Sequence, residues 1–383
     1  MAKEPILVVV FLRGGADGLG LVCPSSDENL RAARPEDLRV AHKGDARGRR
    51  IAQDVADVDF RFHQALSPLA DLYDAGDLSL IHASGLTEAT RSHFDAEARI
   101  ERGLFGDAIP PGAPSGWIGR WLAVARPEGP MAALAVGTSQ PASLYGATPA
   151  VAEQLGDLMV GSGHWLAPAL RARLTEGFGD HGPLEAPVQG LLHLSAMIGQ
   201  RLWSDADQTL ISYDPAVPYP DGALTPALMT VAQGIKSDLG LRVATVDVGG
   251  WDTHVGQAGQ LSAAAGTLAK TLMAFWRDLG KWQQDVSVVV MSEFGRRLRS
   301  NSAGGTDHGR GNVIMVLGPQ ARGGRMIGRW PGLANEALEE GADLAVVTDY
   351  RAVLSELLQG HMNLKDPSQV FPGVTAPPLG LWG

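Results

Sequence analysis

The sequence predicts an α/β fold with a mainly parallel sheet sandwiched between helices. Two apolar, β-branched runs, residues 6–12 and 286–291, are typical of strands that are covered on both faces. Segments with helical spacing, such as residues 257–282, alternate with such runs, and this alternation favours a parallel sheet. At 383 residues the chain is long enough to form one large domain with a substantial core.

The expected elements follow this alternation along the chain. We expect strands at residues 6–12, 78–83, 131–136, 242–248, 286–291 and 313–317. We expect helices at residues 64–75, 184–203, 228–239, 257–282 and 350–361. Residues 1–383 would form a single domain, and the loop-rich stretch 105–225 would be a cap or an insertion within it.

The totals of the chain exclude several classes of protein. A net charge of −10 argues against a nucleic-acid surface, but a metal and a few arginines can still attract a small anionic substrate. The single cysteine, Cys23, rules out an intrachain disulfide and a cysteine zinc cluster.

The N-terminal residues bear on location. The apolar run at residues 6–12 is too short to cross a bilayer, and the residues before it do not resemble a signal peptide. We therefore expect no membrane partner and a cytoplasmic location as written, or a periplasmic one if an export signal was removed before the numbering begins. The oligomeric state stays open.

Asp and His stand beside glycine just after two apolar runs, in GGWDTH at residues 249–254 and in GGTDHG at 304–309. In parallel sheets, ligands bind beyond the carboxyl ends of the strands. Asp252 and His254 are two residues apart, so an extended segment would point both to one side, where they could bind one metal. A carboxylate with an imidazole suits Zn, Mn or Fe better than Ca or Mg. Alternatively, Asp252 caps the next helix and His254 is merely exposed.

Further charged residues follow the other strand ends. Glu293 directly follows the run at 286–291, where a carboxylate needs a cation or an arginine partner, and Arg296 could be that partner. Of the adjacent pair at 307–308 we expect His308 to reach the metal, whereas Asp307 could orient a histidine ring. An ordinary turn explains the second segment equally well. Asp17 ends the first strand in a glycine-rich turn that lacks the dinucleotide-binding spacing.

The segment TRSHFD at residues 90–95 combines a hydroxyl, an arginine, an imidazole and a carboxylate. A serine at a helix start benefits from the positive end of the helix dipole, so Ser92 could be a nucleophile that a metal activates. Ser92 could equally be only a helix cap, with Asp95 three residues later.

Six motifs in this order, FLRGGADGL, RSHFDA, GGWDTH, SEFGRR, GTDHG and TDYR, resemble the bacterial DUF1501 family over nearly the whole chain. That family is grouped with the alkaline phosphatase, sulfatase and phosphoglycerate mutase superfamily. The resemblance implies an alkaline-phosphatase-like fold and usually a two-metal centre. It matches Asp17 to the aspartate that ends the first strand and Ser92, with Thr90 in reserve, to the nucleophile. The remaining ligands are matched by Asp252, His254 and His308.

Two departures from the superfamily pattern stand out. Asp252 and His254 are two residues apart, where a spacing of four is frequent. Glu293 lies where an Asp-His pair is expected, so an imidazole ligand is missing there. The second metal could therefore be weaker, different or absent.

Together these observations predict a metal-dependent hydrolase of phosphate or sulfate esters, with one or two divalent ions, Zn or Mn. The expected metal ligands are Asp17, Asp252, His254, Glu293 and His308. Ser92 would attack, Arg91 or Arg296 would bind the ester oxygens, and His93 would protonate the leaving group. The alternatives are a non-catalytic metal-binding or scaffold protein on a hydrolase fold and a metal-dependent mutase or oxidoreductase.

Overall fold

The computed structural model describes most of the chain. The described residues are 4–41, 43–44, 47–51, 57–104, 115–161, 164–178, 182–204, 206, 209–319, 321–374 and 377–382. Among them, no helix is long and apolar enough to cross a membrane.

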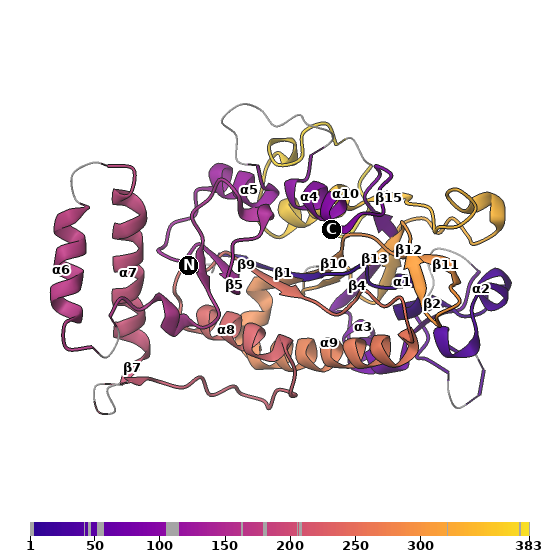
Figure 1. Cartoon of the computed structure of the whole chain (residues 1–383), viewed down its shortest axis with the longest axis horizontal. Helices are drawn as coiled ribbons and strands as arrows, with labels where there is room; N and C mark the ends of the chain where they lie inside the picture. The colour runs from indigo at the N-terminus through magenta and orange to yellow at the C-terminus, as the bar shows by residue number, and fades with distance from the viewer. Residues whose placement is uncertain are drawn as a thin grey trace.

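A nine-stranded sheet forms the centre of the molecule, and helices lie on both of its faces (Figure 1). In order along the sheet the strands are β14 (Arg325–Ile327), β4 (Leu78–Gly85), β13 (Asn312–Leu317), β10 (Val286–Ser292), β1 (Ile6–Leu12), β9 (Val243–Val248), β5 (Ala133–Val136) and β6 (Ala150–Ala152), and β15 (Thr348–Asp349) also pairs with β4. Strand β13 is antiparallel to both of its neighbours, and the other pairings are parallel. The mainly parallel α/β sheet expected from the sequence is therefore confirmed.

The side chains of β1 alternate between two cores, as a strand covered on both faces requires. Val8 and Val10 pack in one core, and Leu7 and Val9 pack in the other. The first core lies under α3 (Ser67–Asp74), α8 (Leu224–Lys236) and α9 (Gln257–Leu279). The second lies under α4 (His93–Arg102), α5 (Trp117–Ala125) and α10 (Tyr350–Gly360). The two groups of helices lie below and above the sheet in Figure 1.

The stretch 105–225 contains two different kinds of structure. Strands β5 and β6 extend the main sheet, whereas α6 (Ala167–Gly177) and α7 (Glu185–Leu202) project beyond its edge (Figure 1). The first part of the stretch, residues 105–114, lies outside the described residues.

Short elements complete the described chain. The helices are α1 (Gly18–Leu21) and α2 (Glu28–Ala33), and a 3-10 turn η2 (Gln64–Leu66) leads into α3. Three small antiparallel pairs are β2 (Val22–Pro24) with β3 (Phe60–Phe62), β7 (Trp203–Ser204) with β8 (Thr209–Leu210), and β11 (Arg296–Ser300) with β12 (Thr306–His308). The β11–β12 hairpin was not expected from the sequence, and it pairs Arg296 with His308 at the end of the sheet.

Candidate metal centre

Three histidines and one aspartate from separate parts of the chain meet beyond the carboxyl ends of the central strands. His93 is the first residue of α4, Asp252 and His254 follow β9, and His308 ends β12. The backbone after β1 approaches this group closely at Gly14. A Cβ atom on Gly14 would lie 2.5 Å from the backbone nitrogen of Asp252, and its φ of +118° also favours glycine.

The Nε2 atoms of the histidines converge on the carboxylate of Asp252. Nε2 of His254 lies 2.8 Å from Nε2 of His308. Oδ1 of Asp252 lies 2.9 Å from the first of these atoms and 3.1 Å from the second. Nε2 of His93 lies 3.5 Å from Oδ2 of the same carboxylate. His93, Asp252 and His308 each offer a ligand atom within 4.8 Å of the others, and His254 lies beside Asp252 and His308 at the edge of this group.

Each histidine ring is held through its other nitrogen. Nδ1 of His93 lies 2.7 Å from Oε1 of Glu293, and Nδ1 of His308 lies 2.8 Å from the backbone oxygen of Arg91. Nδ1 of His254 lies 3.4 Å from Oδ1 of Asp307. Since carboxylate and carbonyl oxygens only accept hydrogen bonds, Nδ1 of His93 and Nδ1 of His308 donate, and Nε2 of each of these neutral rings directs a lone pair into the cluster. Outer partners of this kind orient metal-binding histidines.

This arrangement fits a divalent metal. Nε2 of His254 and Nε2 of His308 lie 2.8 Å apart, and both are within 3.1 Å of Oδ1 of Asp252. Nε2 of His93 is buried and has no hydrogen-bond partner. A tetrahedral ion with bonds of about 2.0–2.1 Å places its ligand atoms roughly 3.3 Å apart, and the separations between neighbouring atoms here run from 2.8 to 3.5 Å.

Charges around the cluster keep its ligands in the forms that bind metal. Partial burial opposes ionisation of Asp252, but hydrogen bonding from the guanidinium of Arg296 lowers the pKa of this carboxyl below its ordinary value. Burial also lowers the pKa of His308, against the opposing effects of the Arg91 carbonyl and Asp252. A carboxylate beside neutral imidazoles is the state that a metal needs.

Arg296 fixes the shape of the cluster. Its side chain is fully buried, and its Nη2 donates to Oδ1 of Asp252 at 2.6 Å. The same guanidinium donates to four backbone oxygens, those of Gly14, Gly15, Trp251 and Thr306. With these donors engaged, Arg296 positions Asp252 and is not placed to bind the oxygens of a substrate.

Glu293, which the sequence suggested as a ligand, contacts the Nδ1 side of the His93 ring. Its Oε1 accepts hydrogen bonds from the backbone of Gly14 and Gly15 and from His93, and its Oε2 accepts one from Ser292. A second group of possible ligands, His93, Glu97 and Glu293, lies on this side of the His93 ring.

The structure does not bring Asp17 into either group of possible ligands. Both carboxylate oxygens of Asp17 accept from Arg34, at 2.5 and 3.0 Å, and one also accepts from Gln257 at 2.6 Å. Asp17 and Arg34 have fully buried side chains. This carboxylate is therefore used in a buried ion pair.

Residues 91 and 92 border the cluster beside His93. The guanidinium of Arg91 is paired with Asp343 and Glu340, and only its backbone oxygen contributes, by holding His308. Ser92 is exposed at the N-cap of α4, and its side chain makes no capping hydrogen bond. Its hydroxyl therefore remains available at the helix start.

Sequence reasoning missed the position of His93 at the cluster. It gave His93 the role of an acid, whereas the ring directs Nε2 at Asp252. The available signal was the histidine beside a predicted helix start, but no spacing linked residue 93 to residues 252–254. The suggestion that Asp307 orients a histidine agrees with its position beside His254.

Comparisons with known proteins give a match to a family model over part of the chain and several distant structural likenesses. The chain resembles the C-terminal periplasmic domain of EcEptC from Escherichia coli, with 8% identity over 98% of this chain and 89% of that one and a TM-score of 0.41. A sulfatase from Pseudoalteromonas sp. has 10% identity over 100% of this chain and 72% of that one, with a TM-score of 0.40. The alkaline phosphatase of the Antarctic bacterium TAB5 has 12% identity over 83% of this chain and 91% of that one, with a TM-score of 0.34.

No curated protein sequence matches the chain. A family model does match its C-terminal part, the stretch that includes Asp252, His254 and His308 but not His93. Residues 229–374 match the family described as "Protein of unknown function (DUF1501)".

Proposed function

We propose that this chain is a metal-dependent hydrolase of phosphate or sulfate esters, built on one divalent ion held by His93, Asp252, His254 and His308. The observation that carries the proposal is the approach of three imidazole Nε2 atoms to one carboxylate, with Nδ1 of His93 and Nδ1 of His308 held by acceptors. Imidazole and carboxylate ligands favour Zn or Mn over Ca or Mg.

When bound, such an ion would lower the pKa of a nearby hydroxyl and offset negative charge on the ester oxygens. Ser92 is the nucleophile that we propose, because its exposed hydroxyl precedes the ligand His93 at the start of a ten-residue helix. Its Oγ would give its proton to solvent and bond to phosphorus or sulfur, while the bond to the ester's alcohol oxygen breaks and that oxygen takes a proton from solvent. Water would then cleave the new Ser92 ester and restore the hydroxyl.

We also propose different roles for three residues from those that the sequence suggested. His93 becomes a metal ligand, since its Nδ1 proton is given to Glu293. Arg91 and Arg296 become positioning residues, because one is paired with Asp343 and Glu340 and the other is fully buried. A non-catalytic metal-binding protein is the second candidate. It is favoured because the guanidiniums of Arg91 and Arg296 are both bound to protein groups and are not free for a substrate.

Turnover of aryl phosphates and aryl sulfates by the purified protein, measured together with its metal content, tests this proposal. We expect Ser92→Ala to keep the metal and to lose at least about 10³-fold in kcat, the scale on which loss of a nucleophile acts. Thr90→Ala tests the reserve nucleophile and should retain most of the activity. Unchanged turnover in Ser92→Ala would remove Ser92 from the mechanism, and bound metal without any turnover would favour the non-catalytic candidate.

A further inference from the structure

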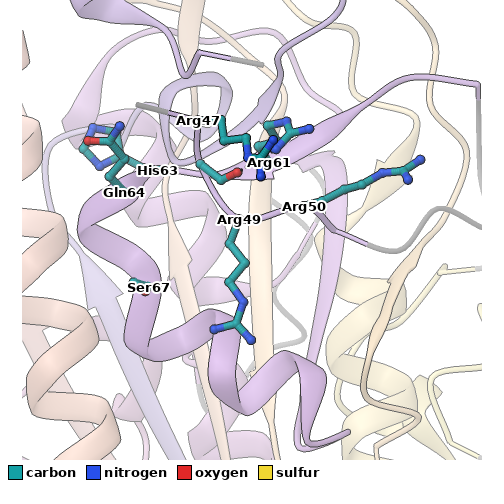
Figure 2. A pocket seen from close by; sticks show the side chains of 8 residues that line it. Arg47, Arg49, Arg50, Arg61, His63, Gln64 and Ser67 are labelled. Atoms are coloured by element: carbon teal, nitrogen blue, oxygen red, sulfur yellow. Dashed lines mark hydrogen bonds between the residues drawn. The ribbon is translucent and has the colours of Figure 1, made fainter. Parts of the chain in front are cut away.

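A cavity of about 590 Å³ lies where residues 47–51 meet β3 and η2 (Figure 2). Its described lining is formed by Arg47, Gly48, Arg49, Arg50, Arg61, His63, Gln64 and Ser67. It thus contains four arginines, and Asp59 beside it pairs with Arg50 and Arg61. None of these residues belongs to the metal cluster. The cavity is thus a second polar site, in a chain whose net charge is −10.

Backbone contacts hold the walls of this cavity in place. The backbone nitrogen of Phe62 donates to the oxygen of Arg49, and that of Ile51 donates to the oxygen of Phe60, both at 2.9 Å. A Cβ atom on Gly48 would lie 2.1 Å from the oxygen of Phe62, so only glycine permits this approach. Residues 47–51 therefore lie against β3 as a preformed wall.

Two arginines contribute donors from this wall and from β3. Arg61 is fixed by Asp59 and by the backbone oxygen of Gly48, which receives its Nη1 at 2.8 Å. Among the described residues, no carboxylate is recorded as a partner of Arg47. Arg49 differs, because its guanidinium is bound to Asp71 and Asp74 of α3. In Figure 2 Arg49 extends toward that helix, away from the part of the cavity where Arg47, Arg61 and His63 are drawn.

His63 adds a neutral donor. Its Nδ1 accepts a hydrogen bond from the backbone of Ala65 at 3.1 Å, so the ring proton must be on Nε2. Burial lowers the pKa of this imidazole, which keeps the ring neutral. The cavity is therefore lined by the guanidinium of Arg47, by that of Arg61, which Asp59 and Gly48 hold in place, and by an imidazole N–H group.

We infer that this cavity binds a small organic phosphate or sulfate. Planar guanidiniums bind the paired oxygens of such groups with two parallel hydrogen bonds. The volume lies within the roughly 300–1,000 Å³ of ordinary ligand pockets, so it accommodates an organic portion as well as the anion. This site is independent of the metal centre and of the reaction proposed there.

Calorimetric titration of the metal-free full chain with glucose 6-phosphate, and with glucose as the neutral control, tests the inference. We expect the phosphate to bind and glucose not to bind. Arg47→Gln and Arg61→Gln should each weaken binding about tenfold, as loss of a charged hydrogen-bond donor does. Arg47 is exposed, so its replacement leaves the fold intact.

Arg49→Gln is the matched control, because it removes the same charge from the same wall. Its binding should stay within about twofold of that of the parent chain. The inference is overturned if glucose 6-phosphate does not bind, if glucose binds equally well, or if Arg49→Gln weakens binding as much as Arg47→Gln. Retention on phosphatidylglycerol vesicles without binding of glucose 6-phosphate would also overturn it, in favour of a lipid surface.

Discussion

Two carboxylates of similar type lie on different sides of the histidine cluster, and they distinguish its two possible metal positions. Asp307 orients His254, whereas Glu97 belongs to the second group with His93 and Glu293. We predict that Asp307→Asn weakens metal binding about tenfold, the low end of the range for outer partners of ligands. Glu97→Gln should leave the metal affinity within about twofold of that of the parent chain. Competition with a chromophoric chelator measures the metal affinity of both variants. A larger loss of affinity in Glu97→Gln than in Asp307→Asn would place the ion beside Glu97.

His82 makes the stability of the fold sensitive to acid. The ring is fully buried in β4, and burial lowers its pKa from 6.5 to about 4. Its Nδ1 accepts from Ala83 and its Nε2 donates to the oxygen of Val22, so the native ring is neutral. The unfolded chain therefore binds more protons between these pH values, and the stabilising effect present above pH 6.5 is lost as the pH falls toward 4.

This difference in pKa corresponds to roughly 3 kcal/mol of unfolding free energy. Urea unfolding at pH 7 and at pH 4.5 should show a loss of this order for the parent chain and a smaller one for His82→Gln. His164→Gln, which changes an exposed imidazole, should behave like the parent chain. Equal losses in all three proteins would show that another group governs the acid response.

At the scale of elements, one buried carboxylate fastens the long segment before α8. Asp278 of α9 accepts from Lys236 at 2.5 Å, from the backbone of Ala216 at 2.6 Å and from the hydroxyls of Tyr213 and Tyr219. Figure 1 shows this segment running below the sheet from β8 to α8. The segment has little secondary structure of its own, so its position depends on these bonds.

We therefore predict that Asp278→Ala frees residues 211–223 and makes them the first site of cleavage by proteinase K. Mass spectrometry of the early fragments locates the cut. Asp214→Asn alters an exposed carboxylate in the same segment and should be cleaved at the rate of the parent chain. An unchanged cleavage pattern in Asp278→Ala would mean that apolar packing alone holds the segment.

The strands and long helices were the elements that the sequence predicted well. Continuous apolar runs gave β1, β9 and β10, and helical spacing gave α7, α9 and α10, because a buried run or stripe has a local signature. The β11–β12 hairpin carries charged residues such as Arg297 and Arg299, so it has no such signature. Its place is fixed by distant contacts, including the bonds from Arg296 to the turn after β1.

At the scale of the whole molecule, the sheet brings together residues that are far apart in the sequence. The sequence suggested Asp252, His254 and His308 from their strand-end positions, and the structure places these three in one cluster. It could not decide the partner of Asp17, because a metal and an arginine satisfy a buried carboxylate equally well. Only the three-dimensional position of Arg34 shows that Asp17 forms an ion pair.

The central claim is that one ion is held by His93, Asp252, His254 and His308. X-ray absorption spectroscopy of the metal-loaded protein at the metal edge tests it most directly. We predict one ion per chain, with three imidazole nitrogens and a carboxylate oxygen around it, and a loss of one imidazole in His93→Ala. A protein that binds no divalent metal, or an ion whose spectrum shows no imidazole, would contradict the account.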